Sequence, residues 1–169
     1  MAVKLNLSQL AGSHRDRVFI GGSYVPNNRT LLTDLESEVQ GANFVPILAD
    51  QFSLDTPDRD IHDVTLWLLH ACRLAIFEVS TLSGALMESE RVGDYGIRKA
   101  LLLYQHPGGL SWPTNPLAWR TTQMLKSLAM EHSSRYTVRP YVRPADALME
   151  VRNFLRAVKR SAYGKLHGL

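Results

Sequence analysis

Short apolar runs alternate along this chain with longer segments of helical spacing. The runs with the β-branched and apolar content of buried strands are 18–20, 44–49, 74–79, 100–104 and 136–142. Apolar residues recur at helical spacing in 31–39, 61–71, 84–95, 117–130 and 144–160. Continuously apolar strands that alternate with helices are typical of a parallel sheet covered on both faces. The pattern therefore predicts a doubly wound α/β fold.

Residues that break the pattern mark boundaries. We expect an N-terminal arm over 1–17, one α/β domain over 18–160 and a C-terminal tail over 161–169. Pro26-Asn27-Asn28 predicts a turn, with Asn28 or Thr30 as the cap of the helix that follows. Pro46 indicates that the run 44–49 is an edge strand or contains a bulge.

Composition narrows the class of protein. The chain has 169 residues, of which 45% are hydrophobic and 21% charged, values ordinary for one soluble domain. The net charge of +3 is too small to argue for nucleic acid by itself, and we do not expect a nucleic-acid partner. Positive residues gather near the carboxyl end, at Arg152, Arg156, Lys159, Arg160 and Lys165. Such a cluster is most often a solvated helix face, and an anionic-ligand or RNA patch is the less favoured interpretation.

Cysteine usage and the absence of long apolar runs predict the compartment. Cys72 is the only cysteine, so no internal disulfide can form, which fits a reducing cytoplasm. No stretch resembles a signal peptide, and no apolar run approaches the ~20 residues that span a bilayer. No histidines or cysteines have metal-ligand spacing. We expect a cytoplasmic protein with no membrane partner, no metal and no bound cofactor.

The glycine turn after the first strand is a candidate binding element. Gly21-Gly22-Ser23-Tyr24 lacks the spacing of a dinucleotide fingerprint and of a phosphate loop. It still offers a backbone that a ligand can approach closely, with a hydroxyl at Ser23 and a phenol at Tyr24. The alternative is a tight turn that needs small residues for packing. Open α/β folds hold ligands at this carboxyl edge of the sheet.

Two carboxylates follow other strands. Asp63 lies at the start of a predicted helix, where it either complements the helix dipole or has a role at the site, binding a sugar hydroxyl or giving a proton to a leaving base. Ser80, Ser83 and Gly84 form a hydroxyl-rich turn whose helix start suits a 5′-phosphate, although Ser83 is equally an N-cap. Glu88 lies about one turn further, either paired with Arg91 on the surface or partly shielded by apolar neighbours.

These segments together resemble a known family. Phe19-Ile20-Gly21-Gly22-Ser23 resembles the opening strand and turn of the nucleoside 2-deoxyribosyltransferases and the deoxynucleoside 5′-monophosphate N-glycosidases. Segments 61–69 and 75–80 resemble that family's second helix and third strand, and 84–88 resembles the segment that carries its nucleophile. The resemblance spans 18–104, about half the chain, and implies a single-domain flavodoxin-like (Rossmann-like) fold, which TIR-like domains share.

The resemblance implies N-glycosidic chemistry. Glu88 would be the nucleophile that forms a glycosyl-enzyme ester, and Asp63 would assist departure of the base or orient the sugar. Gly21, Gly22, Ser23 and Tyr24 would bind the sugar or Glu88. Ser80, Ser83 and Gly84 would bind phosphate or ribose hydroxyls. The implied partner is a nucleoside, a nucleotide or NAD as substrate, and relatives that complete their pockets across subunits imply a homodimer or larger homo-oligomer.

Two residues depart from the family pattern, and two other functions remain open. Glu90 stands where the family often has a small residue, and Thr65 is a second candidate for the sugar-contacting position matched to Asp63. The first alternative is a non-catalytic nucleotide-sensing module of the same fold, as in TIR-like signalling or defence. The second is a structural α/β domain with a solvated Glu88. Hydrolase and transferase activity are both compatible with the sequence.

Overall fold

Five strands form one parallel sheet. The computed structural model describes residues 10–23, 26–52, 61–80, 89, 92, 94–105, 123–125, 127–128 and 130–167. Within them the strands are β1 (Arg17–Gly21), β2 (Val45–Leu48), β3 (Leu74–Glu78), β4 (Lys99–Gln105) and β5 (Tyr136–Tyr141). Their order is β2-β1-β3-β4-β5, and every neighbouring pair is parallel. This is the flavodoxin-like order, so the predicted single-domain α/β fold class is confirmed.

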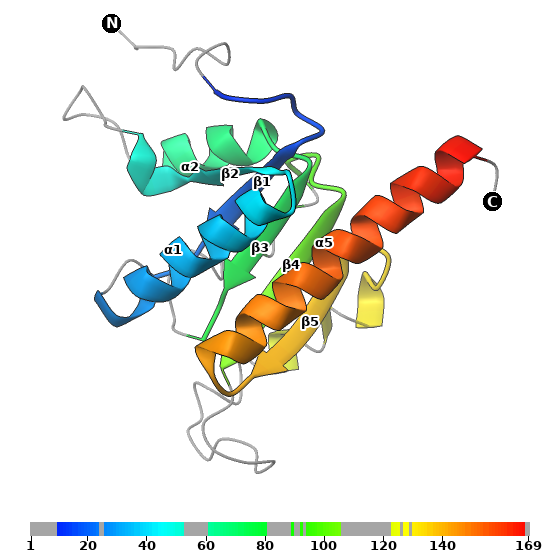
Figure 1. Ribbon diagram of the computed structural model, residues 1–169. Helices are drawn as coiled ribbons and strands as arrows, with labels where there is room; N and C mark the ends of the chain where they lie inside the picture. The colour runs from blue at the N-terminus through cyan, green and yellow to red at the C-terminus, as the bar shows by residue number, and fades with distance from the viewer. Residues whose placement is uncertain are drawn as a thin grey trace, which may run out of the picture.

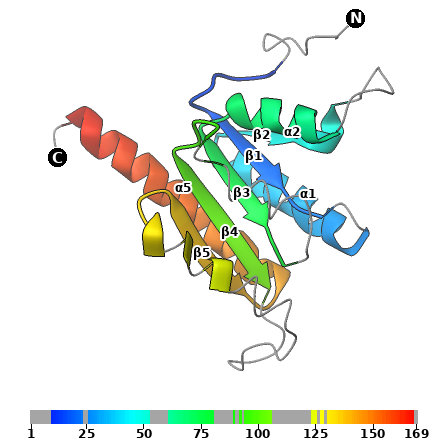
Figure 2. The same ribbon diagram turned by 180° about the vertical axis from the view of Figure 1, so that it is seen from behind.

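Helices cover both faces of this sheet. Helices α1 (Pro26–Gly41) and α5 (Pro144–His167) lie together on one face, which Figure 1 shows in front. Helix α2 (Ile61–His70) lies on the other face, which Figure 2 shows in front. A short 3₁₀ turn, η2 (Ala49–Gln51), follows β2. None of the helices in these described ranges combines the length and apolar character needed to cross a bilayer.

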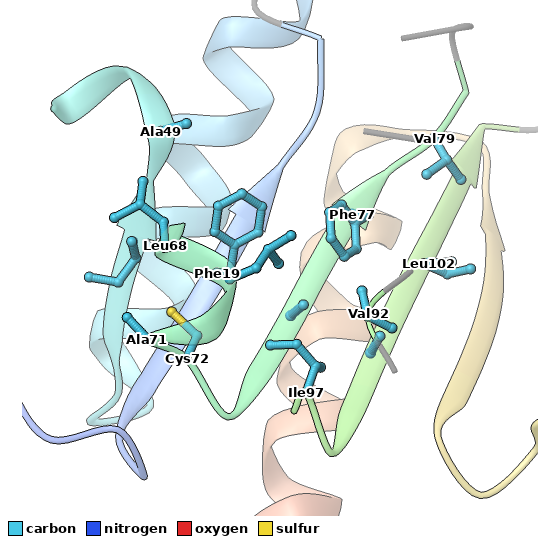
Figure 3. Packing of buried hydrophobic residues seen from close by; sticks show 14 of the residues in the cluster. Phe19, Ala49, Leu68, Ala71, Cys72, Phe77, Val79, Val92, Ile97 and Leu102 are labelled. Atoms are coloured by element: carbon cyan, nitrogen blue, oxygen red, sulfur yellow. The ribbon is translucent and has the colours of Figure 1, made fainter. Parts of the chain in front are cut away.

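The strands place alternate residues in two hydrophobic clusters. On β3, Leu74 and Ile76 pack with α1 and α5, whereas Ala75 and Phe77 pack with α2. Figure 3 shows the α2 side, where Phe19 lies next to Leu68, and the ring centroids of Phe19 and Phe77 are 5.6 Å apart. Because side chains alternate along a strand, Glu78 belongs to the α1/α5 face. A carboxylate therefore ends a strand that is otherwise entirely apolar.

Element boundaries agree with the sequence in most places and differ in two. β2 is an edge strand, as Pro46 predicted. The predicted turn at 26–28 is wrong, because α1 begins at Pro26, whose fixed φ suits the first position of a helix. Helix α5 continues to His167, beyond the predicted end at about residue 160. The helices predicted over 84–95 and 117–130 fall largely outside the described residues. The same holds for most of the predicted loop 51–60 and for all of the predicted loop 106–116.

Candidate functional site

The carboxyl ends of β1 and β3 meet where the chain changes direction across the sheet. From β1 the chain crosses by α1 to β2 on one side, and from β2 it returns by α2 to β3 on the other side. The two connecting helices, α1 and α2, therefore lie on opposite faces of the sheet. Gly21 of β1 pairs with Phe77 of β3, which brings Gly22 level with Glu78. Doubly wound sheets bind their ligands at this position.

Glu78 is a fully buried carboxylate at this edge, with 0% of its surface exposed. The Asn28 side-chain amide donates to its Oε2 at 2.8 Å. The Tyr141 hydroxyl donates to Oε1 at 2.9 Å. The Ser80 backbone N–H donates to Oε1 at 3.2 Å, and the Ser80 hydroxyl donates to the same oxygen. Both carboxylate oxygens therefore have donors, and these donors come from α1, β5 and the turn after β3.

Hydrogen bonds compensate the burial of Glu78. Burying a carboxylate costs several kcal/mol unless its oxygens find donors. None of the four ion pairs in the described part of the chain involves Glu78. Burial and the neighbouring negative charge of Glu78 raise the pKa of Tyr141 above its ordinary value of 10.0. Tyr141 therefore keeps the proton that it donates.

The turn after β3 is also tied to β4. The Ser80 hydroxyl oxygen accepts a hydrogen bond from the Gln105 N–H at 2.7 Å, and the Val79 N–H donates to the Leu103 carbonyl at 3.0 Å. The Ser80 hydroxyl therefore donates to one protein group and accepts from another. Its predicted role in substrate binding stays a prediction. The hydroxyl oxygen has a second lone pair that can accept from a substrate, whereas donation to a substrate would require loss of its bond to Glu78.

Both glycines of the turn after β1 have a packing reason to be small. A Cβ at Gly21 would lie 2.7 Å from the Phe77 ring, and a Cβ at Gly22 would lie 2.9 Å from Leu32 and 3.4 Å from the Glu78 Cβ. Close packing of β1 against β3 and α1 thus accounts for Gly21 and Gly22. Their predicted contact with a ligand stays a prediction, as does that of Ser23, which is half-buried.

The remaining predicted site residues are only partly described. Asp63 lies in the first turn of α2, and Thr65, its alternative, is buried on the same helix. Tyr24, Ser83, Gly84 and Glu88 lie outside the described residues.

Ser89, which follows Glu88 in the sequence, is buried, and its carbonyl accepts a hydrogen bond from the Tyr136 hydroxyl at 2.7 Å.

Of the predicted site residues, the structure brings Gly21, Gly22 and Ser80 together around Glu78. The convergence of these residues with Glu88 stays a prediction.

The sequence does not indicate the residue at the centre of this site. Its patterns predict a buried strand at Glu78, a helix cap at Asn28 and another strand at Tyr141. One signal was available, because Glu78 is the only charged residue in the apolar run 74–79. A charge at the end of a buried strand requires partners. Within the described ranges, no group of three or more His, Cys, Asp or Glu side chains could hold a metal ion.

Comparison with known proteins adds little. No family model matches this chain, and no curated protein matches it. Among solved structures, a de novo designed Rossmann fold protein is similar over 83% of this chain and 98% of its own, with 14% identity and a TM-score of 0.34. A similarity at that level carries no argument about function. The strand order alone defines the class, which is a flavodoxin-like α/β protein.

Proposed function

We propose that this protein cleaves or transfers the N-glycosidic bond of a nucleoside, a nucleotide or NAD at the carboxyl edge of β1 and β3. The observation that carries the proposal is the hydrogen-bonded Glu78 at the topological switch point, beside the turn at Gly21 and Gly22. This edge is where the fold holds small ligands. The resemblance of 84–88 to a nucleophile segment supplies the chemistry.

The Glu78 network supports a functional edge more than a plain scaffold. Replacing a buried charge and its partners with apolar side chains of similar volume often stabilises a protein. The buried hydrogen-bond network of Glu78 is therefore explained better by the residues that it positions at this edge than by a gain in stability. Glu78 holds Ser80, the first residue of the hydroxyl-rich turn that leads toward Glu88 in the sequence. We assign Glu78 as a positioning residue, since its complete burial keeps it from substrate.

The proposed reaction is a double displacement. The Glu88 carboxylate attacks the anomeric carbon while the bond from that carbon to the base nitrogen breaks. The base leaves with the bonding electron pair. A nucleoside base takes a proton that Asp63 donates, whereas nicotinamide leaves NAD as a neutral molecule and takes none. Water or the N–H of a second base then attacks the anomeric carbon and gives its proton to the Asp63 carboxylate, or to solvent where Asp63 kept its own, and the ester bond to Glu88 breaks to release a free carboxylate. Ser23 and Ser80 would orient the sugar and the phosphate.

A non-catalytic nucleotide-binding module is the second candidate. One observation favours it, because the carboxylate that the structure describes at this edge is buried and both of its oxygens accept hydrogen bonds from the protein. Such a group holds the architecture of a binding site without taking part in chemistry. The two candidates share the site and differ only in turnover.

Release of free base distinguishes them. The protein is incubated with NAD, deoxynucleosides and their 5′-monophosphates, and free base is measured by chromatography. Catalysis predicts that Glu88→Gln lowers turnover by about a thousandfold or more, as removal of a nucleophile does. Glu90→Gln, the same substitution two positions further along the chain, is the matched control, and it should keep turnover within about threefold. Binding without base release by the wild type would favour the sensor, and neither binding nor release would exclude both candidates.

A further inference from the structure

Positive residues gather at the amino edge of the sheet, opposite the proposed site. Arg17 is the first residue of β1, and Lys99 is the first residue of β4. Arg73 directly precedes β3, Arg98 precedes β4, and Arg135 precedes β5. Because all the strands are parallel, their first residues lie along one edge. Four of the five strands therefore begin at a cation or directly after one.

Helix α5 adds more positive charge at the same end. It runs back across the sheet, and its second half projects beyond the edge where the strands begin (Figures 1 and 2). Arg156, Lys159 and Arg160 are exposed in this half. The Lys159 Nζ lies 5.3 Å from the centroid of the Phe44 ring, and Phe44 directly precedes β2. That contact holds the basic part of α5 at the amino edge.

We call these exposed and half-exposed side chains the basic pole: Arg73, Arg98, Lys99, Arg135, Arg156, Lys159 and Arg160. The described part of the chain has four ion pairs, Arg29–Asp50, Arg139–Glu150, Arg143–Asp146 and Arg152–Glu38, and none of them includes a residue of the pole. The acidic residues described next to these strand starts are Asp16, Asp94 and Glu131. With Arg15 and Arg17 at the start of β1 included, nine cations minus three anions leaves an excess of +6 at this end, whereas the whole chain carries +3.

A buried arginine adds to the positive field of the pole. The Arg17 guanidinium donates to the backbone carbonyls of Leu10 at 3.0 Å, Ala11 at 2.9 Å, Gly12 at 2.6 Å and Ala71 at 3.4 Å. These acceptors are neutral dipoles, so the charge of Arg17 is solvated but not cancelled. Low-dielectric surroundings screen such a charge less than water does.

We infer that the basic pole binds the phosphodiester backbone of a nucleic acid. Five of its seven residues are arginines, whose planar forks match phosphate oxygens. Helix α5 has 24 residues and is therefore about 36 Å long at a rise of ~1.5 Å per residue. Charges spread between the sheet edge and this helix suit an extended polyanion better than a small one. The net charge alone gives no argument for nucleic acid, but the fold gathers positive charge at one end.

The side chains around the pole favour nucleic acid over a membrane. Membrane-surface helices insert large apolar side chains among their basic residues. The exposed large hydrophobic residues in the described ranges are Met130, Val142 and Met149. Val142 precedes α5 and Met149 lies in its first half, away from the pole, whereas Met130 lies five residues before Arg135, on the side of the pole, and the described basic half of α5 has no such residue. The inference is independent of the proposed glycosidase activity, because the pole and the site lie at opposite edges of the sheet.

Fluorescence anisotropy of the full-length chain tests the inference. The probes are a labelled DNA duplex and a labelled single-stranded RNA, each of about 20 nucleotides, at several salt concentrations. If about four phosphates are contacted, affinity for at least one probe should fall by about a hundredfold between ~50 and ~200 mM salt. The duplex and single-strand arms identify which form of the backbone is bound.

Matched variants locate the contact. Arg98→Gln/Lys99→Gln/Arg135→Gln should weaken binding by about tenfold or more and lower the salt slope by about 2–3. Arg139→Gln/Arg143→Gln/Arg152→Gln removes the same charge from ion-paired positions and should stay within about twofold. Glu88→Gln should bind as the wild type does, whatever its turnover.

Three results would overturn the inference. One is no binding of either probe at low salt by the folded protein. Another is equal weakening by the two triple variants. The third is binding to poly-glutamate or to phosphatidylserine vesicles that is as tight as binding to the nucleic-acid probes.

Discussion

The Tyr141 hydroxyl donates a hydrogen bond to the Glu78 carboxylate at 2.9 Å, although 63 positions separate the two residues in the sequence. Tyr141 ends β5 and Glu78 ends β3, with β4 between these strands. The bond therefore links the outer strand of the sheet to the edge where the proposed site lies. Loss of this hydrogen bond should lower the stability of the protein and also impair the proposed site.

Tyr141→Phe should lower the free energy of unfolding by about 1–3 kcal/mol, because a buried carboxylate loses one of its donors. Denaturant unfolding measures the change. Tyr136→Phe is the matched control, since Tyr136 is equally buried but donates to the neutral carbonyl of Ser89. It should cost about 1 kcal/mol or less. A larger loss for Tyr136→Phe than for Tyr141→Phe would contradict the account of the network.

Stability should fall at alkaline pH, partly through Tyr141. Burial, with the nearby charge of Glu78 second, raises the pKa of Tyr141 above its ordinary value of 10.0. Above pH 10.0 the unfolded chain loses this proton while the folded protein keeps it, so stability decreases as pH rises. The contribution is complete below that pH.

The variant Tyr141→Phe isolates this effect. Burial also raises the pKa of Cys72, from 9.0 to about 12, so the wild type loses stability through both groups. Thermal unfolding from neutral to alkaline pH should therefore show a shallower decline for Tyr141→Phe than for the wild type. Parallel pH profiles for the two proteins would be inconsistent with a buried Tyr141 beside Glu78.

Gly21→Ala should destabilise the protein by about 1–3 kcal/mol, because the new methyl group meets the Phe77 ring at 2.7 Å. Gly41→Ala is the control, since nothing lies within 4 Å of a Cβ at that position. It should be neutral or stabilising by up to about 1 kcal/mol. Thermal and denaturant unfolding of both variants check the contrast, and equal effects would refute the packing explanation.

Arg17→Lys should cost about 2–4 kcal/mol, because an ammonium cannot reach the several carbonyls that the guanidinium bonds. Arg15→Lys, at an exposed position two residues earlier, should change stability by less than about 0.5 kcal/mol. Unfolding midpoints measured side by side give the comparison. A tolerated Arg17→Lys would mean that those bonds contribute little.

The sequence predicted the fold through local patterns that the structure retains. Strand β3 was recognisable as a continuous apolar run, and Pro46 correctly indicated an edge strand, because a residue without an N–H is excluded from the centre of a sheet. The predicted turn at 26–28 is wrong, since Pro26 fits both a turn and the first position of a helix. Only the tertiary environment decides between the turn and the helix start.

The site was less predictable because its contacts are long-range. Asn28 has the composition of a helix cap, and nothing near it in the sequence shows that its amide reaches Glu78. The basic pole also consists of residues that are far apart in the sequence. Arg73, Arg98 and Arg135 are scattered in the sequence, and they share an edge only because the strands are parallel. Charge segregation of this kind cannot be obtained from net charge.

Amide chemical-shift mapping with a deoxynucleoside 5′-monophosphate and with NAD tests the central claim most directly. The account predicts that the largest shifts on titration occur at Gly22, Ser23, Ser80 and Gln105, which surround the carboxyl edge of β1 and β3. Shifts confined to the basic pole, or no saturable shifts with either ligand, would contradict it.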